Sequence, residues 1–312
     1  MEQYPLIIIG SGPAGLTSAI YAARARLQPL VLAGISFGGQ LMNTTEVENF
    51  PGFPEGIMGP LLMQNMIAQA QKFGATVLYE HVNEIEVSAR PFSVTTNNST
   101  YTSDSIIIAT GAEPKKLGLD SETTFWGRGV SSCATCDGAF YKDKVVAVIG
   151  GGDSAMEEAT FLTKFASKVY IIHRRNEFRA SQIMQERVTQ NPKIEVVWNS
   201  TVKEITGEQT VNGLVLEHVE TRQTSTLAVD GVFLAIGYTP NTTFLQGKID
   251  LRPNGYIDAK GEIFTNVEGI FVAGDVEDEI YRQAITAAGA GCKAAIAAEK
   301  WLGGRETVIR NT

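Results

Sequence analysis

Residues 6–15 read LIIIGSGPAG, and residues 144–155 read KVVAVIGGGDSA. Each stretch is a short apolar run followed at once by a glycine-rich turn. Each then leads into a segment of helical composition and a further apolar run, at residues 29–32 and 168–172. A strand, a glycine turn, a helix and a second strand in this order predict a βαβ unit with parallel strands. We therefore expect an α/β protein with two Rossmann-like units.

The small residues of each turn have separate physical tasks. The first glycine permits a tight turn, the second lets the backbone approach a pyrophosphate, and the third small residue lets the helix pack on the strand. The phosphate then lies at the positive end of the helix. One such motif is weak evidence, because glycine turns also serve packing alone, but two in βαβ context indicate two dinucleotide sites. The expected binding residues are Gly10, Ser11, Gly12, Pro13, Ala14 and Gly15 in the first unit and Gly150, Gly152, Asp153 and Ser154 in the second.

The length of 312 residues suggests about two domains. Two similar apolar runs, SIIIATG at 105–111 and VFLAIG at 232–237, are each followed by proline and polar residues, which are typical of connecting segments. We expect the domain crossings there. A strand at 270–273 and an alanine-rich helix from about Tyr281 to Leu302 would rejoin the first unit. The expected domains are residues 1–113 with 242–312, and an inserted domain at 114–241.

Composition and charge restrict the class of protein. The chain is 44% hydrophobic and 19% charged, which is typical of a globular protein. Acidic residues outnumber basic residues by 34 to 26, so nucleic acid and anionic lipid are not expected partners. Only residues 1–5 precede the first apolar run, which is too short for a signal peptide or a membrane span. We expect a cytoplasmic protein.

The second strand of a dinucleotide unit usually ends in an acidic residue for a ribose hydroxyl or in basic residues for a 2′-phosphate. In the second unit the strand is followed by a basic set, His173, Arg174 and Arg175, with Arg179 shortly after. Forked guanidinium donors suit a phosphate, so this position predicts NADPH over NADH. Away from this position, the same charges would be interpreted as a solvated run. In the first unit the strand ends at Ala33 without an acidic residue, and the ribose contact there is unassigned.

A second chemical motif is Cys133-Ala134-Thr135-Cys136, followed directly by Asp137. Two thiols at this spacing can open and close a disulfide by exchange. The alternatives are half of a zinc site, for which no second ligand pair stands elsewhere, and two inert buried thiols. Asp137 could protonate a departing thiolate or a reduced flavin, or it could be a solvated turn residue. The third cysteine, Cys292, is most simply a small buried residue.

Taken together, these motifs resemble the low-molecular-weight thioredoxin reductase family over nearly the whole chain. The resemblance rests on motifs that stand in the family's order: residues 10–15, 38–41 (GGQL), 48–52 (ENFPG), 109–111 (ATG), 133–137, 150–155, 173–175, 274–275 (GD) and 282–284 (RQA).

This resemblance implies that FAD is bound by the first third and the tail, and NADPH by the inserted domain. Ser11 to Ala14 would hold the FAD pyrophosphate, Asp275 would bond the ribityl chain, and Arg282 to Ala284 would lie by the isoalloxazine. The remaining residues expected along the FAD are Gly39, Gln40, Leu41, Asn49, Ala109, Thr110, Gly111, Gly274 and Gln283.

The family's mechanism passes a hydride from NADPH to FAD, two electrons to the dithiol, and then exchanges with thioredoxin. The resemblance implies that Cys136 lies nearest the flavin and that Cys133 attacks thioredoxin. It also implies rotation of the middle domain about the two crossings and a homodimer. Arg128 and Phe140 would be candidates for thioredoxin contact.

Two alternatives remain. One is a related flavoprotein that acts on another small dithiol or protein disulfide, or uses another electron donor. The other is a non-catalytic flavin- or nucleotide-binding redox sensor, which would not need both a 2′-phosphate site and a dithiol. Turnover with NADPH distinguishes the sensor from the enzymes.

Overall fold

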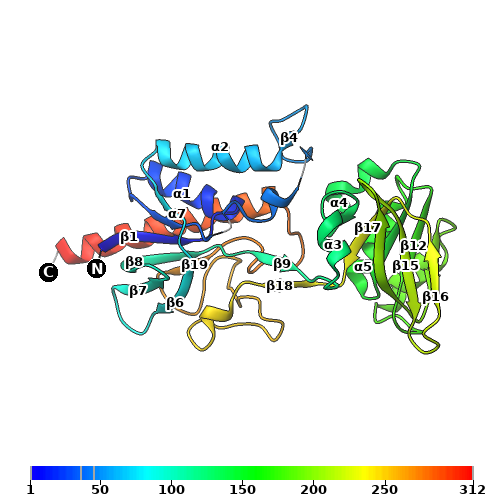
Figure 1. Ribbon diagram of the computed structural model, residues 1–312. Coiled ribbons are helices and arrows are strands. Elements are labelled where there is room, and N and C mark those ends of the chain that lie inside the picture. Colours follow the sequence, from blue (N-terminus) through cyan, green and yellow to red (C-terminus); the bar gives the residue numbers. More distant parts are fainter. Residues whose placement is uncertain (1, 36, 45, 311–312) are drawn as a thin grey trace. The chain divides into compact units, whose positions relative to one another are not determined.

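The computed structural model describes residues 2–35, 37–44 and 46–310, with the backbone alone for residues 305–310. The chain folds into two compact units: unit 1 contains residues 1–113 and 239–312, and unit 2 contains residues 114–238. Each is an α/β unit built on a sheet with parallel strands (Figure 1). The predicted fold class, with one Rossmann-like unit inserted in another, is confirmed.

Unit 1 is built on a seven-stranded sheet of order β5-β2-β1-β8-β7-β6, in which β19 also pairs with β8. Five of its strands are parallel, and β7 and β6 form an antiparallel extension. Because β19 comes from the tail, the tail completes the sheet that the first part of the chain begins. The strands are β1 (Glu2–Ile9), β2 (Leu30–Leu32), β5 (Thr76–Leu78), β6 (Val82–Glu86), β7 (Phe92–Thr96), β8 (Thr100–Ile108) and β19 (Ile270–Val272), with a separate ribbon of β3 (Glu46–Val47) and β4 (Ile57–Met58).

The helices of unit 1 lie together beside this sheet (Figure 1). The strands are apolar toward both faces, as is usual for parallel strands that are covered on both sides. The first and last helices approach closely because their contact is made of small residues: a Cβ on Gly291 would collide with the Ala14 carbonyl, and the Ser18 hydroxyl donates to the Gly291 carbonyl at 3.0 Å. The helical elements are α1 (Pro13–Arg24), α2 (Gly59–Lys72) and α7 (Ala284–Arg310), with 3-10 turns η1 (Gly39–Asn43) and η3 (Thr243–Leu245).

Unit 2 has a five-stranded parallel sheet of order β10-β17-β11-β12-β13 and a three-stranded antiparallel sheet, β14-β15-β16. One apolar cluster lies between the parallel sheet and its helices, and another includes the antiparallel strands. The strands are β10 (Val130–Ser131), β11 (Val145–Gly150), β12 (Lys168–Ile172), β13 (Ile194–Val197), β14 (Ser200–Gly207), β15 (Val211–His218), β16 (Thr224–Leu227) and β17 (Gly231–Ala235). The helical elements are α3 (Asp120–Phe125), α4 (Ala134–Asp137), α5 (Asp153–Leu162), α6 (Gln182–Thr189) and η2 (Gly138–Tyr141).

The chain enters and leaves unit 2 through two paired strands, β9 (Ala112–Pro114) and β18 (Tyr238–Pro240). Backbone hydrogen bonds continue on both sides of the pair: Asn241 N–H donates to the Gly111 carbonyl at 3.0 Å, and Lys115 N–H donates to the Gly237 carbonyl at 2.9 Å. The two crossings therefore form one two-stranded ribbon.

Three helix boundaries differ from the sequence-based expectation. α7 continues to Arg310, beyond the expected end at Leu302, and the other two differ for a reason visible in the backbone. α7 begins at Ala284 and not at Tyr281, because Arg282 has a φ of +47°, which a right-handed helix does not contain. The helical composition after the first glycine turn predicts a helix to about Arg26, but α1 ends at Arg24, because Arg26 has a φ of +63°. In the described part of the chain, no helix is long and apolar enough to cross a membrane.

Candidate active site

The first glycine turn joins β1 to α1 in unit 1. Gly10 has a φ of +113°, in the region that favours glycine, and a Cβ there would collide with the Ala109 carbonyl oxygen. A Cβ on Gly15 would in turn collide with the Gly10 carbonyl. Gly10 and Gly15 are therefore required by the packing of the turn against its own neighbours.

Gly12 has a different role. Its φ of −69° suits any residue, and no described atom beyond its own chain neighbours lies within 4 Å of the place where its Cβ would stand. It is the N-cap residue of α1 and makes no side-chain cap, and Pro13 occupies the first turn of the helix. The open space at this helix N-terminus is therefore where an anionic group would approach the backbone.

Ser11 holds the neighbouring loop in place. Its hydroxyl donates to the Ala33 carbonyl at 2.8 Å and accepts the Gly38 N–H at 2.9 Å. Gly39, with a φ of +65°, then brings η1 against the turn, because its Cβ position is 3.3 Å from the Gly12 Cα. Gln40 and Leu41 lie in η1.

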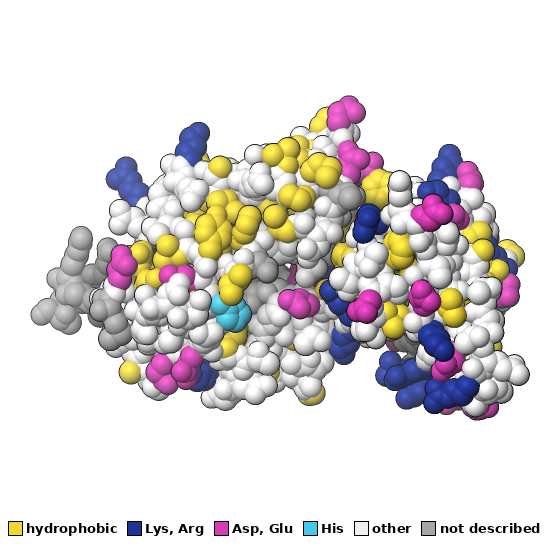
Figure 2. Space-filling view, viewed as in Figure 1, with side chains coloured by type: hydrophobic (Ala, Val, Ile, Leu, Met, Phe, Trp, Pro, Cys, Tyr) yellow, Lys and Arg dark blue, Asp and Glu magenta, His cyan; other side chains and the backbone are white. Residues whose placement is uncertain are grey.

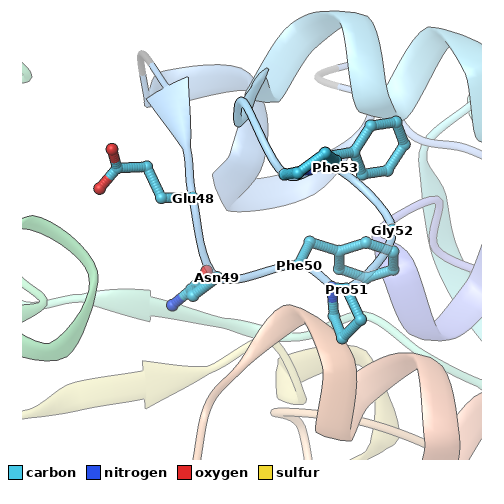
Figure 3. A pocket seen from close by; sticks show the side chains of 7 residues that line it. Glu48, Asn49, Phe50, Pro51, Gly52 and Phe53 are labelled. Atoms are coloured by element: carbon cyan, nitrogen blue, oxygen red, sulfur yellow. The ribbon is translucent and has the colours of Figure 1, made fainter.

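A cavity of about 470 Å³ lies nearby and is lined by residues 48–54 (Figure 3). Its wall is aromatic: the Phe50 and Phe53 rings have centroids 6.4 Å apart. The Asn49 amide donates to the Gln283 side-chain oxygen at 3.3 Å. The structure thus brings together two residues, 234 positions apart, that the resemblance places along the FAD.

Asp275 is an unusual carboxyl group. Its Oδ1 atom is buried and has no hydrogen-bond partner among the described residues. Burial and then the nearby Asp278 raise the pKa of Asp275 to about 7. The preceding Gly274 has a φ of +81°, and its Cβ position is only 2.8 Å from the Ala14 Cβ, so the segment that carries Asp275 packs against the start of α1. A ligand hydroxyl would satisfy this buried acceptor.

Arg282 is held by a residue that the sequence did not single out. Tyr256 is a buried tyrosine, and burial raises its pKa overall. The charge of Arg282 and a hydrogen bond with it act in the opposite direction and lower that pKa. The same guanidinium lowers the pKa of Asp275 against the larger effect of burial. The only sequence signal was an aromatic residue in a glycine-containing loop, which does not indicate a contact with Arg282.

A second unforeseen contact fixes the strand exit at residues 109–111. The Thr110 hydroxyl donates to the Asn241 carbonyl at 2.8 Å, and the Asn241 amide donates to the Thr110 carbonyl at 3.0 Å. From the sequence, Asn241 is only a polar residue of a connecting segment. In the structure its two hydrogen bonds with Thr110 join the ends of the two crossing strands at the edge of unit 1.

The second glycine turn joins β11 to α5 in unit 2. A Cβ on Gly150 would stand 2.5 Å from the Ala235 carbonyl oxygen, and one on Gly151 would collide with the His173 ring. Gly152, the N-cap residue of α5, has no described atom within 4 Å of its Cβ position. In both turns, therefore, glycines with no room for a side chain surround or precede one open glycine at the helix N-terminus.

His173 does not share the environment of its basic neighbours. Its ring is buried and lies 5.6 Å from the Phe178 ring centroid, and burial is the main cause that lowers its pKa. Arg174, Arg175 and Arg179 are exposed at the end of β12. At neutral pH the positive charge of this set therefore comes from the three arginines, and His173 supports the glycine turn.

Asp153 and Ser154 follow the second glycine turn. Asp153 Oδ1 accepts both the Ser181 N–H at 2.8 Å and the Ser181 hydroxyl at 2.7 Å, and these bonds lower the pKa of Asp153. Arg179 N–H donates to the Gly151 carbonyl at 2.8 Å. The loop that carries the arginines is thus attached to the glycine turn at two points.

Cys133 and Cys136 form a disulfide across the short helix α4 in unit 2. Cys133 is half-buried and Cys136 is exposed. Cys133 N–H donates to the Ser131 hydroxyl at 3.0 Å, and the Thr135 hydroxyl lies 3.3 Å from Cys133 Sγ. The pairing of the two sulfurs favours the exchange chemistry over the metal-site interpretation.

Asp137 is largely withdrawn from solvent, and burial raises its pKa, opposed by a hydrogen bond from Ser131. The pKa of the neighbouring Tyr141 is raised to about 12, mainly by burial and then by the charge of Asp137. A carboxyl group that retains its proton closer to neutral pH, one residue from Cys136, is able to donate that proton to a thiolate.

The residues of both units fit the two cofactors that the resemblance implies. In unit 1 the open Gly12 position and the unpartnered Asp275 oxygen suit a pyrophosphate and a ribityl hydroxyl. In unit 2 the open Gly152 position and the three exposed arginines suit a nucleotide with a 2′-phosphate.

Comparison with known proteins agrees with this reading. The family model described as pyridine nucleotide-disulphide oxidoreductase matches residues 4–291. A thioredoxin reductase from Streptomyces coelicolor is 54% identical over 300 residues, which cover 95% of this chain and 93% of that protein.

Solved structures give the same result. A thioredoxin reductase from Giardia duodenalis matches with a TM-score of 0.92 and 43% identity, over 97% of this chain and 100% of that one. A thioredoxin reductase from Streptococcus pyogenes matches with a TM-score of 0.92 and 40% identity, over 97% and 99%. The resemblance found from the sequence motifs is confirmed.

Proposed function

Because the chain belongs to the pyridine nucleotide-disulphide oxidoreductase family, we propose that it reduces thioredoxin with electrons from NADPH, through FAD and the Cys133–Cys136 disulfide. The observation that carries this proposal is the closed disulfide, on a turn that precedes a glycine motif with arginines at its ribose end. A non-catalytic sensor has no use for this combination. The relatives named above carry the same activity in their names.

Unit 1 would hold FAD. The backbone from Ser11 to Ala14 would face the pyrophosphate, with the open Gly12 position as the point of closest approach. Asp275 would accept a ribityl hydroxyl on its unpartnered oxygen. When bound, FAD accepts a hydride from NADPH and supplies two electrons to the disulfide. The other residues assigned to this site are Gly10, Gly15, Gly39, Gln40, Leu41, Asn49, Ala109, Thr110, Gly111, Gly274, Arg282, Gln283 and Ala284.

Unit 2 would hold NADPH. Gly150, Gly152, Asp153 and Ser154 would form the turn against the pyrophosphate, and the arginines at 174, 175 and 179 would pair with the 2′-phosphate. His173 would act through packing, because its ring is buried against Gly151. We assign the NADPH domain to residues 114–241 and the FAD domain to 1–113 with 242–312, which differ from unit 2 and unit 1 only in residues 239–241 of the crossing.

The dithiol then carries out the exchange. Two electrons break the bond between the two sulfurs, and Asp137 protonates one of them, which we assign to Cys136. The Cys133 thiolate attacks one sulfur of thioredoxin and releases the other as a thiolate. Cys136 loses its proton and attacks Cys133, which releases reduced thioredoxin and closes the enzyme disulfide again.

Access to two partners requires movement. We propose that unit 2 rotates on the β9–β18 ribbon, so that the disulfide meets the flavin in one arrangement and thioredoxin in the other. Phe140, with 40% of its surface exposed, and Arg128 would contact thioredoxin from the segments that flank the dithiol.

We further propose a cytoplasmic homodimer. Apolar side chains gather over the helical side of unit 1 (Figure 2), and exposed members of α1, α2 and α7 include Tyr21, Leu61 and Ile296. An apolar surface of this kind is usually covered by a partner. Light scattering of the purified holoenzyme should give about twice the mass of 33.7 kDa.

The deciding experiment is steady-state reduction of a disulfide-containing thioredoxin with NADPH and with NADH. The wild type should contain FAD and prefer NADPH, whereas Cys136→Ser should bind FAD but show no turnover. Cys292→Ser serves as the matched control and should retain activity, because Cys292 lies in α7 of unit 1. A wild type without flavin or without NADPH-dependent disulfide reduction would refute the proposal. Activity with small dithiols but not with thioredoxin would favour a related flavoprotein.

A further inference from the structure

The side chain of Thr135 contacts a sulfur of the disulfide. Its hydroxyl oxygen lies 3.3 Å from Cys133 Sγ. In the disulfide, Cys133 carries no hydrogen on sulfur, so the hydroxyl is the donor and the sulfur the acceptor. The contact is local, because Thr135 lies two residues beyond Cys133 in α4, and Thr135 itself is exposed.

The other hydrogen bonds at Cys133 involve its backbone. Its N–H donates to the Ser131 hydroxyl, and its carbonyl accepts the N–H groups of Cys136 and Asp137 at 3.2 and 3.1 Å. The Thr135 hydroxyl is therefore the donor that the described structure places on the sulfur.

The elements that pack closely on the disulfide turn carry no cationic side chain. α4 packs against η2 and α5. Within these three elements, all of them described, the titratable side chains besides the cysteines are neutral or acidic: Asp137, Tyr141, Asp153, Glu157 and Glu158. These elements contain no lysine, arginine or histidine that could stabilise a thiolate by its charge. Stabilisation of the charged sulfur therefore depends more on a neutral hydrogen-bond donor.

We propose that the Thr135 hydroxyl is a catalytic group that stabilises the Cys133 thiolate by a hydrogen bond. This inference rests on the proposed function, which gives the two sulfurs different tasks, and it adds the group that holds the charge on Cys133. Reduction of the disulfide by two electrons breaks the bond between the sulfurs and leaves both as thiolates. Cys136 takes the proton from Asp137, while Cys133 remains charged on the Thr135 hydroxyl.

The same bond acts in the exchange step. The Cys133 thiolate forms a bond to one sulfur of the partner, and the partner's own disulfide bond breaks, so that its second sulfur leaves with the electron pair. When Cys136 then attacks Cys133, the bond between Cys133 and the partner breaks and the enzyme disulfide re-forms. The enzyme thus loses the two electrons that the partner gains.

Thr135→Val removes the hydroxyl and keeps the branched shape, and Thr135→Ser keeps the hydroxyl. Loss of one hydrogen bond to the half-buried Cys133 sulfur should raise the pKa of Cys133 by about half a unit to one unit, so the thiolate fraction below that pKa falls about three- to tenfold. A more basic thiolate is also the better nucleophile. The valine variant should therefore react more slowly than the wild type at low pH and equally fast or faster at high pH.

The experiment measures alkylation of Cys133 by iodoacetamide from pH 5 to pH 10 on full-length flavin-loaded protein reduced with dithiothreitol. Peptide mass spectrometry reports Cys133, Cys136 and Cys292 separately, and Cys292 is the internal control. The proposal expects the Cys133 profile of Thr135→Val to move to higher pH, with Thr135→Ser close to the wild type and Cys292 unchanged. Superimposed Cys133 profiles in all three proteins would overturn it, as would an equal shift in both variants.

A parallel arm separates this inference from the proposed function. The same labelling after reduction by NADPH alone shows whether electrons reach the dithiol. If NADPH fails in the wild type while the profiles after dithiothreitol still differ, the Thr135 contact is supported and the proposed function is wrong. Flavin content and melting temperature of each variant show that it is folded.

Discussion

The Tyr238 hydroxyl donates a hydrogen bond of 2.7 Å to the Ser132 carbonyl. Tyr238 is the first residue of the crossing strand β18, and Ser132 directly precedes Cys133. The position of this ring follows from the fold, because β17, which leads to Tyr238, runs parallel to β10, which leads to the disulfide turn. The crossing ribbon is therefore attached to the segment that carries the dithiol.

Tyr238→Phe removes this hydrogen bond and keeps the ring. We expect thioredoxin reduction to slow about two- to tenfold, since one hydrogen bond contributes about 1 kcal/mol, while reduction of the bound flavin by NADPH proceeds at the wild-type rate. Stopped-flow absorbance follows the two half-reactions separately. Tyr170→Phe, in β12 of the same unit, is the control. An equal slowing of both half-reactions would show that the hydroxyl supports unit 2 in general and not the dithiol segment.

Asp275 predicts a pH dependence of stability for the flavin-free protein. The pKa rises from 3.8 to about 7 on folding. Because the folded pKa is the higher one, the contribution of Asp275 to the free energy of unfolding is fully present below pH 3.8 and is lost as the pH rises through 7. Between these pH values the carboxyl ionises in the unfolded chain but stays protonated in the folded protein. Over this window the group should lower the free energy of unfolding by about 4 kcal/mol.

Asp275→Asn removes this titration. Urea unfolding of the flavin-free wild type should lose stability relative to the variant between pH 4 and pH 7, and the two curves should run in parallel below pH 4. Asp258→Asn, an exposed carboxylate of the same unit, should follow the wild type. Parallel curves for wild type and Asp275→Asn over the whole range would mean that the carboxyl is solvated in the flavin-free protein.

Local sequence patterns predicted both βαβ units because the information there is short-range. An apolar run, a turn of glycines and a following helix are consecutive in the sequence. Gly10 is needed there for its positive φ, and Gly150 because a Cβ would collide with the Ala235 carbonyl. The spacing of Cys133 and Cys136, with two residues between them, is also local information: it predicted a redox pair or half of a metal site, and the structure closes the pair as a disulfide. Such features need no knowledge of distant segments.

Contacts between distant segments were not predictable in this way. Tyr256 with Arg282, and Thr110 with Asn241, join positions 26 and 131 residues apart, and neither residue type at these positions indicates its partner. The position of the His173 ring was also not predictable from local sequence. Its place beside two arginines suggested a basic residue at the 2′-phosphate, whereas in the fold its ring is buried against Gly151.

The arginines at the end of β12 predict the choice of nicotinamide cofactor. Arg174→Ala combined with Arg175→Ala should reduce the preference for NADPH over NADH about ten- to a hundredfold, because each forked pair with a phosphate is lost. The ratio of kcat/KM values for the two cofactors measures this. Arg222→Ala, an exposed arginine of unit 2 paired with Glu217, is the control and should leave the ratio unchanged. An unchanged ratio in the double variant would show that the 2′-phosphate is bound elsewhere.

Gly10 and Gly12 offer a test of which glycines serve the fold and which serve the ligand. Gly10→Ala puts a methyl group into the Ala109 carbonyl at a φ of +113°, so it should destabilise flavin-free unit 1 and lower its melting temperature.

Gly12→Ala puts the same methyl group into space where no described atom beyond the chain neighbours of Gly12 lies within 4 Å. It should leave the flavin-free melting temperature unchanged and weaken FAD binding by about a hundredfold or more, because the methyl group occupies the approach of the pyrophosphate. Calorimetry of the flavin-free proteins and fluorescence titration with FAD measure the two effects. Normal FAD affinity in a folded Gly12→Ala would place the pyrophosphate away from the N-terminus of α1.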